Sequence, residues 1–464
     1  MFRSSDHDPL SAAIAPPSNE TPAARTARLR AEAEARRVSE EIDEQLKAER
    51  AARRRQRPCV KVLLLGQSES GKSTTLKNFQ MQYARETWLE ERSSWRAIIQ
   101  LNLIRSIVTV LDLLGDALVG PALDSPSALS MPLTEKHRLL RLRLAPLRGV
   151  QQDLQRRLGA AAIEESYNPG PGGVLPRPSS EFAVRSHDGW RSALERFRAR
   201  PQEAQESARA ADARVRKAAE VTEVVVGCAE DMKALWEDHA VREMLRRKKI
   251  RMEEEPGFFL NDIERIATRD YEPSDNDVIR ARLRTLGVQE YSFWVEQTGH
   301  EWLMYDVGGT RSSRAHWYPY FDDMEAIIFL APISSFDERL REDRRVNRLE
   351  DTYMLWQTLC SLQMLSKTQI ILFLNKCDLL EQKLRAGVRV RTHVPSFGNR
   401  SNDVDTVKKY FQSHFKEIAK QHSPEPRRFY VHLTSVIDTR STAATLRTVE
   451  DGILRASLRR ADLL

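Results

Sequence analysis

A glycine-rich segment near residue 66 has the residue types and spacing needed to bind a phosphate chain. The run from Gly66 to Ser73 fits the pattern G-x-x-x-x-G-K-[ST]. Glycine permits the sharp turn that lets backbone N–H groups and a helix N-terminus face an anion. We expect Lys72 to lie along the β- and γ-phosphates of a nucleotide, and the hydroxyl of Ser73 to bind Mg²⁺. The bare pattern also occurs by chance, so the segments around it must distinguish a phosphate-binding loop from a chance match.

The segments on either side supply the context that this motif requires. Residues 60–65 form an apolar run that is typical of a buried strand. Residues 74–79 can continue as a helix. A strand, a loop and a helix in this order favour a phosphate-binding loop over a chance match.

A second polar motif, Asn375-Lys376-Cys377-Asp378, directly follows the apolar run 369–374. The carboxylate of Asp378 can accept hydrogen bonds from the N1–H and 2-amino groups of guanine, a donor pair that adenine lacks. Asn375 and Lys376 would brace the loop and cover the base. Alone, the tetrad is equally compatible with a polar strand end. With a phosphate-binding loop on the same predicted sheet, the guanine interpretation is favoured.

A third motif, Asp306-Val307-Gly308-Gly309, follows the strand-like run 301–305. Asp306 can reach Mg²⁺ through a water molecule, and the N–H of Gly309 can approach a γ-phosphate because glycine has no side chain. Such a turn is a weak signal by itself, since similar turns are common in β-hairpins.

In their order and spacing, these motifs resemble the alpha subunit of heterotrimeric G proteins, of a divergent fungal type. The resemblance covers residues from about 38 to the C-terminus, except an insert near 116–220. Further matching stretches are Leu235-Trp236-Glu237-Asp238, 277–285, 306–312 and 434–439.

The resemblance implies an α/β fold, a Ras-like P-loop GTPase with a doubly wound sheet and an inserted all-helical domain. The alternating strand-like runs at 289–295, 300–307, 325–333, 369–376 and 428–436 agree with this. We expect a disordered tail at 1–20, an N-terminal helix at 21–57, the Ras-like GTPase domain at 58–80 and 276–464, and the helical domain at 81–275. The irregular insert near 116–220 suggests no function beyond that of a tolerated surface insertion.

The resemblance also implies roles for individual residues. Two would be catalytic (Arg282, Thr310), and two would bind Mg²⁺ through their hydroxyls (Ser73, Thr285). The expected GTP-binding set is Gly66, Glu69, Ser70, Gly71, Lys72, Ser73, Thr74, Ile279, Arg280, Arg282, Thr285, Asp306, Gly308, Gly309, Asn375, Lys376, Asp378 and Val436.

Three members of that set carry specific expectations from the resemblance. Arg282 matches a built-in arginine finger, which neutralises charge that develops during phosphoryl transfer. Glu69 matches an acid that can pair with Arg282 across the nucleotide. Val436 replaces an alanine whose backbone N–H meets the guanine O6. Without its neighbours, Arg282 would be read as a solvated arginine at a helix end.

The main departure from the family pattern is Thr310, which stands where a glutamine orients the attacking water. A threonine side chain is shorter and offers one hydroxyl instead of an amide. Because a misplacement of ~1 Å can cost ~10²-fold in rate, we expect GTP binding with slow intrinsic hydrolysis. The alternative is compensation by a neighbouring residue or by a regulator that supplies its own group.

Composition limits the classes of partner. The 464 residues suffice for two ordinary domains plus tails, and the formal net charge is +7. Basic clusters such as 53–57 and 246–249 could meet nucleic acid, anionic lipid or an acidic partner. No aromatic residues are interleaved with these clusters, so we expect no nucleic acid partner. Four widely spaced cysteines indicate a reducing compartment and no metal site.

Membrane attachment is expected to be peripheral. Position 2 is Phe2, so the N-myristoylation pattern is missing, and no cysteine precedes Cys59. No run reaches the ~18 apolar residues of a membrane span. Attachment would then depend on basic residues or on partners. We expect a cytoplasmic protein at the inner face of the plasma membrane.

The resemblance further implies a G-protein beta–gamma dimer, a G-protein-coupled receptor and an unknown effector as partners. Residues 39–46 match the helix that docks the beta subunit, although a solvated helix without a partner is the alternative. The C-terminal stretch 443–464 matches the receptor-binding tail. Trp317 either contacts beta–gamma or packs in the core. Glu254-Glu255 occupy the inter-domain segment where the family usually has a small hydroxyl, and we expect a bulky acid there to loosen the closed form and speed nucleotide release.

Three functions remain in competition. The first is a GTP/GDP switch that transduces a receptor signal. The second is a hydrolysis-deficient G-protein-like scaffold that holds nucleotide, which Thr310 would explain. The third is an ATP-using P-loop kinase, which Asp378 disfavours.

Overall fold

The computed structural model describes most of the chain from residue 59 onward. Its described residues are scattered positions between 21 and 44, then 59–119, 133–157, 183–184, 220–248, 250–285, 287–295, 299–321, 324–340, 343–366, 368–425 and 429–460. They fall into two compact units, 1–59 and 60–464. The predicted tail at 1–20 and most of the insert near 116–220 lie outside the described residues.

The described positions of the first unit between Pro22 and Glu44 are helical, and Cys59 begins the first strand of the sheet. Within this helix, the guanidinium of Arg37 and the carboxylate of Glu34 lie 2.6 Å apart, one helical turn from each other. The helix predicted at 21–57 stays a prediction, because most of its residues lie outside the described ones.

The second unit is built around a six-stranded sheet in the order β4-β5-β1-β6-β7-β8. β1 pairs with β6, β6 with β7 and β7 with β8 in parallel, whereas β4 and β5 are antiparallel. The strands are β1 (Cys59–Gly66), β4 (Val288–Val295), β5 (His300–Val307), β6 (Ala326–Pro332), β7 (Gln369–Asn375) and β8 (Phe429–Leu433). This order confirms the predicted doubly wound sheet, although β8 ends three residues before the predicted position.

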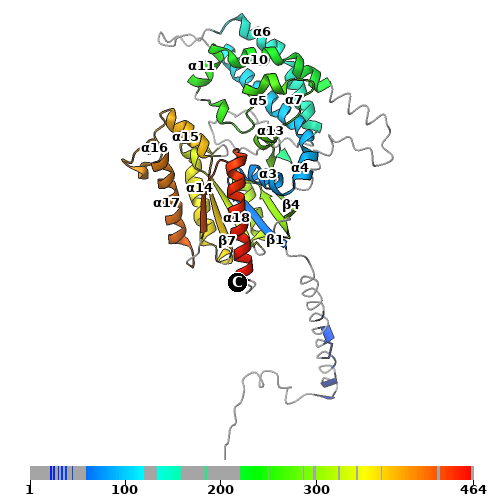
Figure 1. Ribbon diagram of the computed structural model, residues 1–464, viewed down its shortest axis with the longest axis vertical. Helices are drawn as coiled ribbons and strands as arrows, with labels where there is room; N and C mark the ends of the chain where they lie inside the picture. The colour runs from blue at the N-terminus through cyan, green and yellow to red at the C-terminus, as the bar shows by residue number, and fades with distance from the viewer. Residues whose placement is uncertain are drawn as a thin grey trace, which may run out of the picture. The chain divides into compact units, whose positions relative to one another are not determined.

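Helices cover both faces of the sheet (Figure 1). They are α3 (Lys72–Tyr83), α14 (Arg348–Ser361), α15 (Cys377–Arg385), α16 (Val390–His393), α17 (Val404–His422) and α18 (Thr439–Arg460). Alternate residues of β1 point to opposite faces, so Leu64 joins the core under α3 and α18, whereas Leu63 joins the core under α14 and α17. β6 and β7 are buried along their whole length, as expected of central parallel strands.

A helical part is inserted between α3 and β4. It contains α4 (Arg85–Arg92), α5 (Arg96–Val119), α6 (Glu135–Arg143), α7 (Pro146–Arg157), α10 (Ala229–Glu237), α11 (His239–Arg247), α12 (Ile263–Ile266) and α13 (Asp275–Arg280). The long apolar helix α5 is its centre and packs against α6, α7, α11 and α12. Two short strands, β2 (Ala183–Val184) and β3 (Arg284–Thr285), pair in parallel.

Short 3₁₀ helices connect several of these elements. They are η1 (Ser93–Trp95), η2 (Met252–Glu254), η3 (Leu260–Asp262), η4 (Arg311–Tyr320), η5 (Ile333–Asp337), η6 (Gln363–Leu365) and η7 (Pro395–Phe397). Of these, η2, η4 and η5 flank the candidate site described below.

One described helical stretch, Arg85–Leu118, is long and apolar enough to cross a membrane by length and composition alone. Our expectation that no such run exists is wrong by this measure. However, 72% of its most apolar window is buried inside the protein, which is typical of a core helix.

Candidate nucleotide-binding site

The phosphate-binding loop connects β1 to α3 through two glycines with positive φ. Gly66 ends β1 at φ +143°, and a side-chain Cβ there would lie 2.5 Å from the carbonyl oxygen of Leu330. Gly71 precedes α3 at φ +106°, and a Cβ there would collide with the amide of Asn375. Glycine is needed at both positions, for conformation and for space.

Lys72 is held over this loop by backbone oxygens. Its Nζ donates to the carbonyls of Gly66 and Gln67 at 2.8 and 2.7 Å. Burial lowers the pKa of Lys72 to about 8, while the charge of Asp306 acts in the opposite direction. A phosphate placed beside this ammonium would favour its charged form, since opposite charges attract.

Ser73 and Asp306 meet although they are far apart in the sequence. The Ser73 hydroxyl, in the first turn of α3, donates to Asp306 Oδ2 at 2.6 Å from the end of β5. A hydroxyl and a carboxylate are oxygen ligands of the kind that Mg²⁺ prefers, directly or through water. The donor set therefore fits this ion. Thr285 belongs to β3, but its side chain lies outside the described residues.

The guanine-type tetrad is hydrogen-bonded to the phosphate-binding loop. Asn375 Nδ2 donates to the Ser70 carbonyl at 2.7 Å, and Asn375 Oδ1 accepts from the Val436 backbone N–H at 3.2 Å. Lys376 adopts a left-handed conformation at φ 62° and immediately precedes α15. The carboxylate of Asp378, in the first turn of α15, accepts from the Ser435 hydroxyl at 2.6 Å. The structure thus brings both motifs to one edge of the sheet.

Gly309 lies directly against the phosphate-binding loop. Its carbonyl accepts from the Ser68 N–H at 3.1 Å. A Cβ at Gly309 would lie 2.6 Å from the carbonyl oxygen of Gln67 and closer still to its carbonyl carbon. The neighbouring Gly308 donates its N–H to the Gly287 carbonyl at 2.8 Å. Only glycine allows the turn after β5 to approach the loop this closely.

The Arg282 side chain also contacts the phosphate-binding loop. Its guanidinium lies 2.7 Å from the carboxylate of Glu69, and both side chains are about nine-tenths buried. Glu69 itself has a positive φ of 62° and also faces Arg348 at 3.5 Å. The pair that the sequence suggested is therefore present.

Thr310 is occupied within its own turn. Its hydroxyl donates to Ser313 Oγ at 2.9 Å, and Ser313 Oγ in turn donates to the Gly308 carbonyl at 2.7 Å. These contacts hold the Thr310 side chain at the start of η4. Trp317, further along η4, is buried and donates its ring N–H to the Gly308 carbonyl at 3.0 Å. This position favours the core-packing interpretation of Trp317.

Two other predicted residues have side chains that interact with protein. Ile279 is 1% exposed and belongs to the apolar core. The guanidinium of Arg280 donates to the Phe258 carbonyl at 2.8 Å and to Asp262 at 3.1 Å. Thr74 lies inside α3. Nucleotide contacts at Ile279 and Arg280 would therefore use the backbone.

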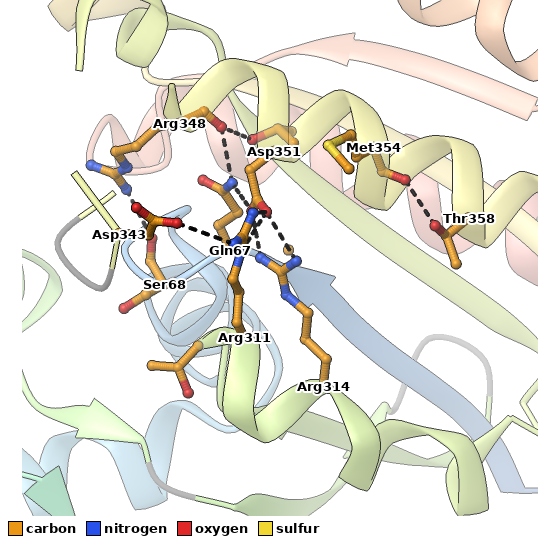
Figure 2. Close-up of polar contacts among 12 residues, drawn as sticks. Gln67, Ser68, Arg311, Arg314, Asp343, Arg348, Asp351, Met354 and Thr358 are labelled. Atoms are coloured by element: carbon orange, nitrogen blue, oxygen red, sulfur yellow. Dashed lines mark hydrogen bonds and ion pairs between the residues drawn. The ribbon is translucent and has the colours of Figure 1, made fainter. Parts of the chain in front are cut away.

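Asp351, in α14, is a site residue that sequence reasoning missed (Figure 2). Its buried carboxylate accepts from Arg311 Nε at 3.1 Å and from Arg314 Nη1 at 3.2 Å, both in η4. It also accepts from the Gln67 amide of the phosphate-binding loop. Burial alone raises the pKa of Asp351, but these donors outweigh it and lower that pKa. Asp351 thus joins the loop, η4 and α14.

A second missed contact joins the helical part to the sheet part. Lys383, in α15, is buried and lies 2.6 Å from Asp337, 2.8 Å from Glu338 and 3.4 Å from Glu254. Glu254, in η2, also pairs with Arg251 at 2.8 Å. Burial alone lowers the pKa of Lys383, but the charges of Glu338 and Asp337 outweigh it and raise that pKa.

A family model for the G-protein alpha subunit matches residues 36–453. This chain belongs to the G-protein alpha subunit family. The family membership confirms the resemblance seen in the sequence and the fold expected from it. It also identifies the chain as a nucleotide-binding protein of a signal-transducing family.

Named fungal relatives agree with this assignment. The guanine nucleotide-binding protein alpha-4 subunit of Mycosarcoma maydis is 30% identical, over 98% of this chain and 96% of that protein. A guanine nucleotide-binding protein subunit alpha of Coprinellus congregatus is 28% identical, over 93% and 97%. The alpha-2 subunit of Neurospora crassa is 27% identical, over 92% and 96%.

Proposed function

We propose that this G-protein alpha subunit is a GTP/GDP switch that binds Mg²⁺ with its nucleotide and hydrolyses GTP slowly. One observation carries the nucleotide assignment. The guanine-type tetrad is joined to the phosphate-binding loop by the 2.7 Å bond from Asn375 to Ser70. The tetrad can therefore bind a base while the phosphate-binding loop joined to it binds the phosphates of the same nucleotide.

Each group at the site has a separate task in hydrolysis. Lys72 would neutralise the β- and γ-phosphates, and Ser73, Thr285 and Asp306 would hold Mg²⁺, which supplies further positive charge to the phosphates. Arg282 would neutralise charge that develops on the transferred group. It stays beside Glu69 until the phosphates compete for its guanidinium.

Slow hydrolysis is supported by the position of Thr310. Its hydroxyl already bonds with Ser313, and a threonine cannot span both an attacking water and the γ-phosphate. The same observation favours a second candidate function, a nucleotide-holding scaffold that barely turns over. Measured turnover separates the two, because a switch must return to the GDP form, whereas a scaffold stays bound to GTP.

The proposed partners are a beta–gamma dimer, a G-protein-coupled receptor and an effector, at the inner face of the plasma membrane. Family membership supports the first two. The direct test is to identify the nucleotide that the purified full chain carries, by acid release and chromatography. GDP or GTP in near-equal ratio to protein is expected. A chain that carries adenine nucleotide, and binds GDP no better after exchange, would refute the proposal.

A further inference from the structure

Arg282 is held at its backbone by a single amide from the helical part of the protein. The Arg282 N–H donates to Asn102 Oδ1 at 2.6 Å, and Asn102 Nδ2 donates to the Arg282 carbonyl at 3.0 Å. Asn102 lies in α5 and is 8% exposed. Both backbone polar groups of Arg282 are thus taken by one side chain, 180 residues away in the sequence.

Two further contacts restrict the same stretch of chain. Lys77 Nζ, in α3, donates to the carbonyls of Val278 and Ala281 at 2.9 and 2.7 Å. A Cβ on Gly257 would lie 2.5 Å from Asn102 Oδ1 and 3.0 Å from Arg282 Cβ. The space around the amide is therefore closed, so Asn102 has little freedom to move away from Arg282.

We propose that Asn102 is a positioning residue that fixes the Arg282 guanidinium for phosphoryl transfer. This inference rests on the function proposed above. Asn102 touches no reacting atom and acts through the Arg282 backbone. Because an arginine has four rotatable side-chain bonds, its head group is placed well only if its Cα is placed well. The helical part then contributes to catalysis through Arg282.

The alternative is that Asn102 merely stabilises the fold. The matched control is Gln100, another buried amide of α5, whose Nε2 has no hydrogen-bond partner within the described part of the chain. Gln100→Ala and Asn102→Ala each remove one buried amide from the same helix. Only the second removes a contact with Arg282.

The experiment measures single-turnover GTP hydrolysis by the full chain, with Thr310→Gln in every variant so that the rate is measurable. Asn102→Ala should lower the rate ~10- to 100-fold, as expected for a misplacement of ~1 Å. GDP affinity should change less than ~3-fold, because the effect lies in the transition state. Gln100→Ala should leave the hydrolysis rate within ~2-fold of the parent, because Gln100 does not contact Arg282.

The deciding comparison is a double-mutant cycle with Arg282→Ala. If Asn102 acts through Arg282, Asn102→Ala should have no further effect on the rate once the guanidinium is gone. A loss of the same size in both backgrounds overturns the proposal, as does an unchanged rate in Asn102→Ala. If the wild-type chain binds no guanine nucleotide, the proposed function has failed and the inference falls with it.

A second variant and a second readout cover the case in which Asn102→Ala does not fold. Asn102→Asp keeps the acceptor for the Arg282 N–H, loses the donor to the Arg282 carbonyl and adds a negative charge. Its affinity for GDP with aluminium fluoride, a mimic of the transferring phosphoryl group, is measured by calorimetry against its affinity for GDP. A selective loss for the mimic supports the proposal. Equal affinities in Asn102→Asp and the Asn102 parent overturn it.

Discussion

The ammonium of Lys383 and the carboxylate of Glu254 lie 3.4 Å apart and join α15 of the sheet part to η2 of the helical part. The Lys383 side chain is 1% exposed and has two further acidic neighbours, Asp337 and Glu338. These two carboxylates hold the ammonium in place independently of Glu254. The carboxylate of Glu254 in the helical part therefore forms an ion pair with Lys383 in the sheet part. This is the opposite of our expectation that it loosens the closed form.

Glu254→Gln should speed GDP release. Removing the negative charge weakens the contacts of Glu254 with Lys383 and with Arg251, which lies 2.8 Å from it. Since Glu254 is partly exposed, the contact is worth ~1 kcal/mol, or a ~5-fold faster release. Dissociation of a fluorescent GDP analogue measures this rate. The control is Glu253→Gln, because the Glu253 carboxylate has no ion pair with Lys383. Equal release rates in the two variants would contradict the prediction.

Thr310→Gln should speed hydrolysis of bound GTP. An amide can both donate and accept, so it can orient water and contact the γ-phosphate together. We expect the variant to approach the family rate of ~10⁻² per second, and the wild type to be at least ~10-fold slower. Thr310→Ser keeps the hydroxyl and serves as the control. A wild-type chain that already reaches the family rate in a single-turnover assay would show that another group compensates.

Asp351→Asn should destabilise the fold more than Gln67→Ala. The first change removes the counter-charge of Arg314 and leaves Arg311 with Asp343, 3.9 Å away, which costs ~3 kcal/mol. The second removes one hydrogen-bonding amide and costs ~1–2 kcal/mol. Urea denaturation midpoints of the full chain compare the two. The reverse order would show that Asp351 is not the centre of this contact.

Asp277 should make stability depend on pH in the acid range. Burial alone raises the pKa of Asp277, but bonds from Arg265 and Ser274 lower it to about 2, below its ordinary value of 3.8. The unfolded chain then binds more protons between these values, so this contribution is present above pH ~4 and is lost as the pH falls towards 2. Denaturation midpoints of wild type and Asp277→Asn should converge over that window. A difference that stays constant from pH 5 to pH 2.5 would refute this assignment.

The sequence predicts local motifs well because a strand, a turn and a capped helix are specified by neighbouring residues. The loop at Gly66–Ser73, the tetrad at Asn375 and the turn after Asp306 are of this kind. Asp351 and Asn102 could not be predicted, since each lies in an ordinary helix and contacts its partner across a long sequence separation. An asparagine or an aspartate in a helical segment indicates, by residue type alone, only a helix-capping or solvent-exposed polar side chain.

The central claim is that one rigid edge of the sheet binds a guanine base and its phosphates together. Calorimetric titration of the nucleotide-free full chain with GDP and with ADP, each with Mg²⁺, tests it most directly. We expect GDP to bind at least ~10³-fold more tightly, because ADP leaves the Asp378 carboxylate without its two donors. Asp378→Ala should remove most of this preference. Equal affinities for GDP and ADP in the wild-type chain would contradict the account.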